Sequence, residues 1–168
     1  MTGHQTARLI APTSRLHRAW LDAHAEWGPG RHEDGFGLTA ADEIDSATGF
    51  AGWIRRMAGE SAQTTYRWIV DDSQVLGGIA LHHQLDDHVR WAGHIGFGIR
   101  PSARGHGLAG WALGCMLERA RRLGMDRVLL VCAAGNNASA RTIRRGGGVL
   151  EGVVDTELGP AQRYWITL

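Results

Sequence analysis

The chain contains 168 residues, and its 18 basic residues against 17 acidic ones give a formal net charge of +1. This length suffices for one domain whose core needs neither disulfides nor a metal ion. Because a nearly neutral chain has no strong field to hold a phosphate backbone, the composition argues against a nucleic-acid partner.

The cysteines and the first residues favour a cytoplasmic protein. Cys115 and Cys132 fall in a predicted helix and a predicted strand and form no C-x-x-C pair, so we expect small core residues in a reducing compartment. The opening stretch MTGHQTARLIAPTS has no apolar signal segment. A run of about 18 apolar residues, as a membrane span requires, is also absent from the sequence. We therefore expect no membrane partner.

The first third of the chain predicts two helices separated by a long loop. Apolar residues at helical spacing predict a helix over 14–27, with Ser14 as its N-cap. The same spacing predicts a second helix over 45–59, with Asp45 or Ser46 as its N-cap. Residues 28–45 are rich in glycine and acids without any period, which is typical of a loop that shapes a binding site.

Residues 65–99 change to a period of two and predict three strands. The stretches 65–70, 74–83 and 91–99 alternate between apolar and polar positions, and residues 84–90 form a polar loop between the last two. Consecutive strands joined by such short connections predict an antiparallel meander.

The remaining sequence predicts two helices and three strands. A long helix is expected over 107–123, with its apolar residues facing inward, and a second helix over 137–145. The strand 127–132 lacks polar alternation, so we expect it to be buried on both faces and to pair in parallel after the crossover helix. Terminal strands follow over 148–155 and 161–168. The fold class is therefore α/β, with a mixed sheet.

The stretch RPSARGHGLAG (100–110) leads from a strand through glycines into a helix, which predicts an anion site. Gly105, Gly107 and Gly110 match the dinucleotide pattern G-x-G-x-x-G. That pattern needs a parallel βαβ unit and an acid after the next strand, and VLLVCAAG carries no acid. An NAD-dependent oxidoreductase is therefore the weakest alternative. The turn also matches R-x-x-G-x-A.

The stretches HIGFGIRPSARGHGLAGWAL and RVLLVCAAGNNASARTIRRGGGVLEG resemble the GNAT superfamily of N-acetyltransferases, over roughly residues 74–168. More narrowly, HHQLDDHVRWAGHIGFGIRP resembles a bacterial branch in which a His-x-Leu-Asx-Asp loop precedes Gly-His-Ile-Gly. The resemblance implies an acyl-CoA N-acyltransferase fold: a mostly antiparallel central sheet with splayed fourth and fifth strands, flanked by helices. We expect one domain, 1–168, with acceptor-side helices in 1–64 and the acetyl-CoA-binding core in 65–168.

The resemblance implies acetyl-CoA as the acetyl donor, with its pyrophosphate held by main-chain amides of the glycine turn. A Cβ at Gly105 or Gly107 would collide with the phosphate or forbid the required dihedral angles. Asn137 and Ser139 match positions that contact the cofactor in the family. A simpler interpretation of this stretch is that Asn136 or Asn137 is only the N-cap of the last helix. The cofactor-binding residues implied are Phe97, Ile99, Arg104, Gly105, His106, Gly107, Leu108, Ala109, Asn137 and Ser139.

His94 is the candidate general base. An alkyl ammonium, with a pKa of ~10, must lose a proton before it attacks a thioester. Many GNAT members use a fourth-strand glutamate for this step, and His94 stands at the matching position. Period two places it beside Gly96 and Gly98, which leave space for an acceptor. The alternative is a half-buried histidine that only forms hydrogen bonds.

The resemblance breaks at Ile143, where many members have a tyrosine that protonates the leaving sulfur. A thiol with a pKa of ~8.5 leaves without strong acid assistance, so the loss is tolerable. Tyr164 is a substitute, although strand packing explains it more simply.

His82 and His83, with Asp86 and Asp87, suggest a metal site, but neighbouring strand residues point to opposite faces, so we expect no metal. Asp86, Asp87 and the acids of the loop 28–45 either attract a cationic amine into the site or are solvated turn residues.

The leading hypothesis is an acetyl-CoA-dependent N-acetyltransferase acting on a primary amine of a small molecule. Two alternatives remain: a protein N-terminal acetyltransferase, and a CoA-binding sensor that has lost turnover. Trp27, Trp53 and Trp91 are candidates for lining the acceptor cavity. The resemblance is also compatible with a homodimer.

Overall fold

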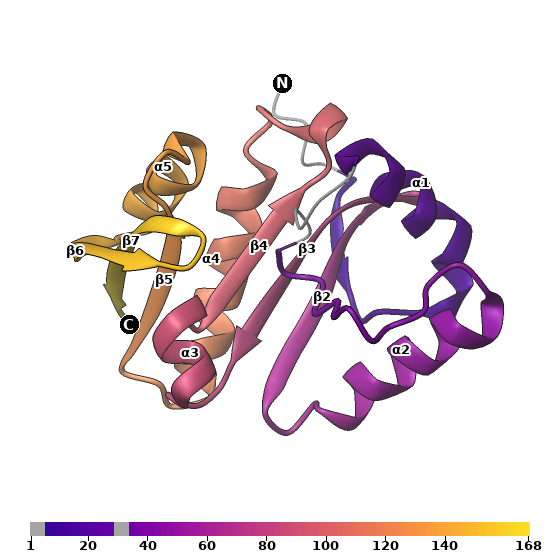
Figure 1. Cartoon of the computed structure of the whole chain (residues 1–168), viewed down its shortest axis with the longest axis horizontal. Helices are drawn as coiled ribbons and strands as arrows, with labels where there is room; N and C mark the ends of the chain where they lie inside the picture. The colour runs from indigo at the N-terminus through magenta and orange to yellow at the C-terminus, as the bar shows by residue number, and fades with distance from the viewer. Residues whose placement is uncertain (1–5, 29–33) are drawn as a thin grey trace. The chain divides into compact units, whose positions relative to one another are not determined.

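The computed structural model describes residues 6–28 and 34–168, and Figure 1 shows their helices and strands. The chain divides into two compact units. The first comprises residues 1–80 and 97–108, and the second comprises 81–96 and 109–168. The chain therefore passes back and forth between the units.

A four-stranded sheet has the order β1-β2-β3-β4 and lies mostly in the first unit. The order confirms the predicted meander of β2, β3 and β4. The first strand was not predicted, because three residues are too few to show a period; Arg8 pairs antiparallel with Val70. The bounds are β1 Arg8–Ile10, β2 Thr64–Asp71, β3 Gln74–His82 and β4 Ile95–Ile99.

The helices of the first unit begin close to where the sequence predicted. A short 3-10 turn η1 (Ser14–Leu16) precedes α1 (His17–Trp27), and the Thr13 side chain caps it by accepting from the Arg15 amide, so the cap lies one residue before Ser14. α2 (Ala47–Gly59) is capped by Ser46, as predicted.

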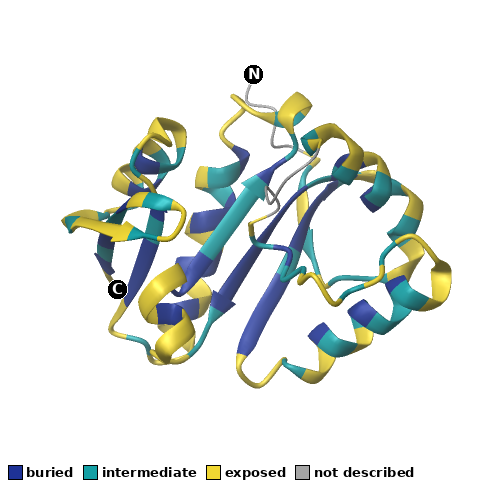
Figure 2. Ribbon diagram, in the orientation of Figure 1, coloured by how far each residue is buried: buried dark blue, intermediate teal, exposed yellow. Residues whose placement is uncertain are grey.

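Aromatic rings fill the core of the first unit. Trp20 packs edge-on against Trp53, with ring centroids 4.8 Å apart, and both indoles are buried. Trp53 is therefore a core residue and not an exposed acceptor contact, while Trp27 packs at the edge of the same cluster. Figure 2 shows the buried positions on these elements.

A three-stranded antiparallel sheet, with the order β5-β7-β6, forms the second unit's framework. Its bounds are β5 Arg127–Ala133, β6 Val149–Thr156 and β7 Gly159–Thr167. The parallel pairing predicted for β5 is wrong: among the described residues β5 lies at the end of its sheet and its strand partner is β7, which runs antiparallel to it. A single antiparallel bridge joins Gly93 to Leu130 where the chain enters β4.

Three helices carry residues of the second unit: α3 (Asp87–Ala92), α4 (Leu108–Arg122) and α5 (Asn137–Arg145). The apolar residues of α4 face inward as predicted, and those that are buried are Leu108, Ala112, Leu113, Met116, Leu117 and Ala120. The helix α3 replaces the polar loop expected over 84–90: the Asp86 side chain caps it at the Val89 amide, and Val89 is buried. No described helix is long and apolar enough to cross a membrane.

Candidate active site

The glycine turn follows β4 directly and has the backbone that its sequence requires. A 3-10 turn η2 (Pro101–Ala103) leads into Arg104, and Gly105 and Gly107 then have φ angles of 78° and 76°. An L side chain rarely adopts such angles, so both glycines are needed for the backbone path. At Gly105 an added Cβ would meet nothing within 4 Å, so the dihedral angle, and not crowding, explains this glycine.

The turn is held from within by Arg104 and opens onto the start of α4. The Arg104 side chain donates through Nε to the Ile99 carbonyl at 2.9 Å, and its backbone amide bonds to Pro101. Because the first amides of a helix have no partner within the helix, the residues at the start of α4 direct unpaired donors and the positive end of the helix dipole outward. This arrangement suits a phosphate group.

Glu26 on α1 fixes the beginning of the turn. Its carboxylate accepts from Arg100 at 2.5 Å and from both the amide and the hydroxyl of Ser102, at 3.0 and 2.9 Å. The hydrogen bond from Arg100, followed by that from the Ser102 amide, lowers the pKa of Glu26 to about 2. The sequence carries no local signal of this contact, because Arg100 and Glu26 are 74 positions apart.

The space beside Gly98 on β4 and beside Gly78 on β3 is occupied. An added Cβ at Gly98 would lie 2.8 Å from the backbone oxygen of Asp34, and one at Gly78 would lie 2.8 Å from the Phe36 ring. Residues 34–36 of the long loop therefore pack onto β3 and β4. The predicted open channel beside Gly98 is not present in this part of the structure.

A charged cluster holds that loop against α2. Arg56 bonds to Asp42 at 2.8 Å and to the Gly37 carbonyl at 2.6 Å, and it also pairs with Glu60 at 2.8 Å. Tyr66 donates to Glu60, and burial, followed by this hydrogen bond, raises the pKa of Tyr66 to about 12. The acidic side chain of Asp42 is therefore already engaged and not free to attract a cationic acceptor.

In the second unit, His94 is tied to β5 by its backbone and its side chain. Its amide donates to the Leu129 carbonyl at 2.7 Å, and the Leu129 amide donates to the imidazole Nδ1 at 2.8 Å. The side chain is only 4% exposed, and burial, followed by the charge of His82, lowers the pKa of His94 to about 4. At neutral pH the ring is therefore neutral, with its proton on Nε2.

This geometry does not favour His94 as a general base. The lone pair of Nδ1 is occupied by the Leu129 amide, and Nε2 carries a proton. A group with its pKa near 4 also has a weak affinity for the proton of an ammonium. The arrangement suits a structural role, in which His94 holds the residue before β4 against β5 and donates one hydrogen bond.

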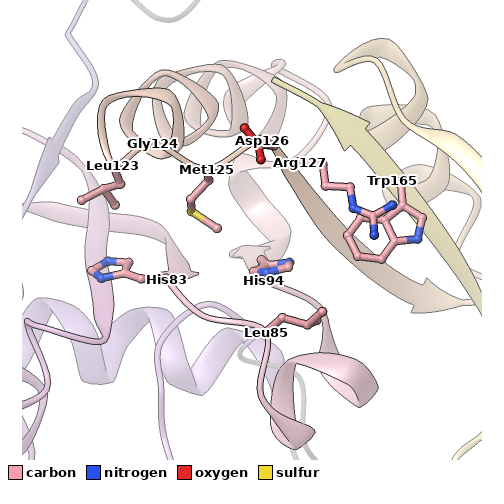
Figure 3. A pocket seen from close by; sticks show the side chains of 9 residues that line it. All are labelled: His83, Leu85, His94, Leu123, Gly124, Met125, Asp126, Arg127 and Trp165. Atoms are coloured by element: carbon pink, nitrogen blue, oxygen red, sulfur yellow. The ribbon is translucent and has the colours of Figure 1, made fainter.

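A cavity of about 390 Å³ opens beside His94 in the second unit (Figure 3). The guanidinium of Arg127 stacks on the Trp165 ring at 4.1 Å from its centroid, and Asp126 lies next to it in the chain. The His94 side chain therefore borders this cavity and is not surrounded only by packed core residues. The side chains and residues that line the cavity are His83, Leu85, His94, Leu123, Gly124, Met125, Asp126, Arg127 and Trp165.

At the start of α5, the Asn136 side chain accepts from the Ser139 amide at 3.2 Å, so Asn136 is the N-cap. Asn137 is then the first helical residue, and the capping interpretation is confirmed for Asn136. Ile143 is buried, and an added Cβ at Gly148 would lie 2.5 Å from it. The helix therefore uses this position for packing.

Tyr164 on β7 is fully buried, and its hydroxyl donates to Gln162 at 2.7 Å. Strand packing accounts for it, as the simpler interpretation held. Trp91, by contrast, lies on α3 and is 66% exposed. Within residues 6–28 and 34–168, no group of three histidine, cysteine, aspartate or glutamate side chains is arranged to hold a metal ion.

Of the predicted site residues, Phe97, Ile99, Arg104, Gly105, His106, Gly107 and Leu108 lie together on β4 and the turn in the first unit. Ala109 follows on α4, and Asn137 and Ser139 lie on α5 of the second unit. Their roles toward a ligand remain predictions. Within the turn, the Arg104 side chain bonds to the Ile99 carbonyl and the His106 ring bonds to the Ala103 carbonyl. These bonds stabilise the turn itself.

Comparisons with known proteins agree with this geometry. A sequence model of the acetyltransferase (GNAT) domain matches residues 41–149, which include the glycine turn. A comparison with curated protein sequences finds no match.

Solved structures share the fold at low sequence identity. A probable acetyltransferase has 20% identity and a TM-score of 0.78, with 97% of this chain and 93% of that chain covered. The ribosomal-protein-S5-alanine acetyltransferase from Vibrio fischeri has 13% identity and a TM-score of 0.77, with the same coverage. The microcin C7 self-immunity acetyltransferase MccE, in complex with acetyl-CoA and AMP, has 16% identity and a TM-score of 0.71, with 98% and 93% covered.

Proposed function

Because the chain belongs to the acetyltransferase (GNAT) domain family, we propose that it transfers an acetyl group from acetyl-CoA to a primary amine. The observation that carries the proposal is the turn of Gly105 and Gly107, whose positive φ angles lead directly into the start of α4 within the matched residues. A binding turn of this kind fits the pyrophosphate of CoA, and the similar MccE structure holds acetyl-CoA.

The donor is held by the turn and by the end of β4. Main-chain amides from Arg104 to Ala109 bind the pyrophosphate, and the charge of Arg104 adds to the helix dipole. The backbone near Phe97 and Ile99 bonds to the pantetheine arm, to which Asn137 and Ser139 add contacts. Glu26 contributes indirectly, because it orients Arg100 and Ser102 at the entrance of the turn.

The reaction is direct attack on the thioester. The neutral amine nitrogen forms a bond to the acetyl carbonyl carbon, and the carbon–sulfur bond breaks to release CoA as a thiolate. Backbone amides stabilise the oxyanion that forms between these steps. The amine proton passes to solvent, and the thiolate needs no phenol at position 143, since a thiol with a pKa of ~8.5 is a good leaving group.

His94 serves this reaction as a positioning residue that aligns β4 with β5. Its two hydrogen bonds with Leu129 fix the position of the chain directly before β4. The cavity beside His94 admits water for proton transfer. The neutral imidazole contributes a donor at Nε2 and not a base.

The acceptor is a small amine. A second candidate, the N-terminus of a protein, is favoured by two similar structures: the S5-alanine acetyltransferase above, and a Salmonella typhimurium enzyme that modifies the N-terminal serine of ribosomal protein L7/L12. A small amine and a protein N-terminus differ in size. Residues 34–36 of the loop pack onto β3 and β4 and reduce the space for an acceptor on that side of the sheet.

Release of free thiol from acetyl-CoA tests the proposal. The purified chain is assayed with polyamines, aminoglycosides and short peptides with free or blocked N-termini. Amine-dependent thiol release with mass-verified acetylation of the acceptor supports the enzyme. Tight binding of acetyl-CoA without release by any acceptor supports the alternative of a CoA sensor, and weak binding of acetyl-CoA contradicts both.

A further inference from the structure

The cavity beside His94 belongs to the second unit alone. Its lining residues come from the segments 83–94 and 123–127 and from β7, all of which lie in that unit. The segment 123–127 follows the last turn of α4, whereas the glycine turn immediately precedes the first turn of this helix. The cavity is therefore a separate site from the turn that binds the proposed donor.

His94 brings one hydrogen-bond donor to the wall of this cavity. The Leu129 amide occupies Nδ1 at 2.8 Å, so the ring proton is on Nε2. Nε2 has no hydrogen-bonding partner in residues 6–28 and 34–168, and protein atoms do not enclose it completely. The side chain as a whole is nevertheless only 4% exposed. A nearly buried donor in this state favours a ligand that accepts a hydrogen bond.

Arg127 supplies a positive charge to the same cavity (Figure 3). Its guanidinium carbon lies 4.1 Å from the centroid of the Trp165 ring, and the centroid of the His94 ring lies 6.2 Å from that of Trp165. Arg127 forms no hydrogen bond or ion pair with any described side chain. Stacking holds the guanidinium against the face of the indole, and its N–H groups remain able to bind a ligand.

The nearby acids do not neutralise Arg127. Glu151 on β6 accepts from Arg163 at 2.7 Å and from the Trp165 indole at 3.0 Å, so both of its oxygens are already engaged. Asp126 is the acidic residue of the lining, and it is exposed and forms no ion pair with Arg127. The positive charge of Arg127 therefore remains available to an anion.

Apolar side chains form another part of the lining. Leu85 and Leu123 are 45% and 44% exposed, and Met125 also lines the cavity. Exposed apolar side chains beside a few polar groups are typical of a site for a small organic ligand. The volume of about 390 Å³ lies within the range of such sites, roughly 300–1,000 Å³.

These groups match a carboxylate with an apolar body better than a phosphate. One guanidinium balances a single negative charge, and its planar N–H groups can bind both oxygens of a carboxylate. A phosphate dianion would need a second positive group, and it would meet the Asp126 carboxylate and the apolar side chains of Leu85 and Leu123. The lining therefore favours the carboxylate.

We propose that this cavity binds a small carboxylic acid with an apolar body, whose carboxylate accepts from Arg127 and from Nε2 of His94 while its apolar part contacts Leu85 and Leu123. The site shares no residue with the glycine turn. Binding there goes beyond the proposed acetyl transfer, and it can be measured without acetyl-CoA and without turnover.

Titration of the full chain with hexanoate, followed by the NMR signal of the Trp165 indole N–H, tests the proposal. Trp165→Phe identifies the signal. We expect a saturable shift, with a dissociation constant at least about tenfold lower for hexanoate than for hexanamide, which lacks the charge, or for acetate, which lacks the apolar body. No saturable shift by about 10 mM hexanoate overturns the proposal. Equal affinities for hexanoate and hexanamide, or tighter binding of inorganic phosphate than of hexanoate, also overturn it.

A matched pair of arginine variants locates the ligand. Arg127→Met raises the dissociation constant for hexanoate at least about tenfold, because it removes the charge at the cavity. Arg144→Met is the control: Arg144 also lies over a ring of β7, 5.6 Å from the Tyr164 centroid, but it does not line the cavity. This variant leaves the constant unchanged, and thermal melting followed by circular dichroism checks that both variants fold. Equal effects of the two variants overturn the proposal, and so does competition between hexanoate and CoA for one site.

Discussion

At the scale of single residues, His94 couples folding to pH. Burial holds the pKa of His94 at about 4, below its ordinary value of 6.5, so the folded chain disfavours the protonated ring. Between these two values the unfolded chain binds more protons than the folded chain. Stability is therefore full above pH 6.5 and is lost as the pH falls toward 4, by about 3 kcal/mol for a shift of this size.

The variant His94→Asn removes this dependence. We expect the free energy of unfolding of the wild type to fall between pH 7 and pH 5, and that of the variant to change less over the same range, as measured by urea denaturation. Equal slopes in the two proteins would show that His94 does not titrate as described. The pH range stays above the window in which Glu26, with its pKa near 2, protonates.

His94 variants also separate a positioning role from a base. An asparagine side chain oxygen accepts the Leu129 amide as Nδ1 does, whereas alanine leaves that amide unpaired. We expect kcat to remain within about fivefold of wild type in His94→Asn and to fall more than about thirtyfold in His94→Ala, consistent with a lost buried hydrogen bond. An equal, large loss of kcat in both variants, with acetyl-CoA binding retained, would instead identify His94 as the base.

At the scale of elements, α1 controls the glycine turn through Glu26. In Glu26→Gln the Arg100 guanidinium loses its charged partner while the Ser102 amide keeps an acceptor. We expect the dissociation constant for acetyl-CoA, measured by calorimetry, to rise about threefold to tenfold, since charge-assisted bonds are worth more than neutral ones. Glu60→Gln, which removes a comparable pair on α2, serves as the control. The same loss of affinity in both variants would exclude a specific link between α1 and the turn.

The elements themselves were largely predictable, because amphipathic periods and local caps depend on neighbouring residues. The long helix α4, the strand β5 and the Ser46 cap of α2 follow from such local signals. The helix α3 was missed, because six residues are too few for a period and its single buried residue, Val89, gives none. The pairing of β5 failed for a different reason: its partner is β7, which comes much later in the chain, with Ala133 opposite Ala161 and Arg127 opposite Thr167.

The candidate site was predictable only where the backbone requires particular residues. Gly105 and Gly107 must be glycine, so the sequence reveals the turn. The contact of Glu26 with Arg100 and the packing of Asp34 over Gly98 join distant parts of the chain and leave no local pattern. The bond of His94 with Leu129 likewise depends on tertiary structure, so the sequence could not show that its Nδ1 is occupied.

At the scale of the whole molecule, the glycine turn lies in the first unit, and the predicted residues of α5 lie in the second. Family membership and the low-identity structural likenesses support the donor more strongly than the acceptor, because the matched residues begin at 41 and include the whole turn. The described residues before 41 include α1 and residues 34–40 of the long loop, with Glu26 and Phe36 among them.

The central claim is that the turn from Arg104 to Ala109 binds the pyrophosphate of acetyl-CoA. Calorimetric affinities for acetyl-CoA and for S-acetylpantetheine, which lacks the pyrophosphate, test it in the wild type and in Gly107→Ala. We predict that acetyl-CoA binds the wild type at least about a hundredfold more tightly, and that this advantage falls below about tenfold in the variant, a loss of about 1.4 kcal/mol or more. Equal affinities for the two compounds in the wild type, or an advantage that Gly107→Ala leaves intact, would contradict the account.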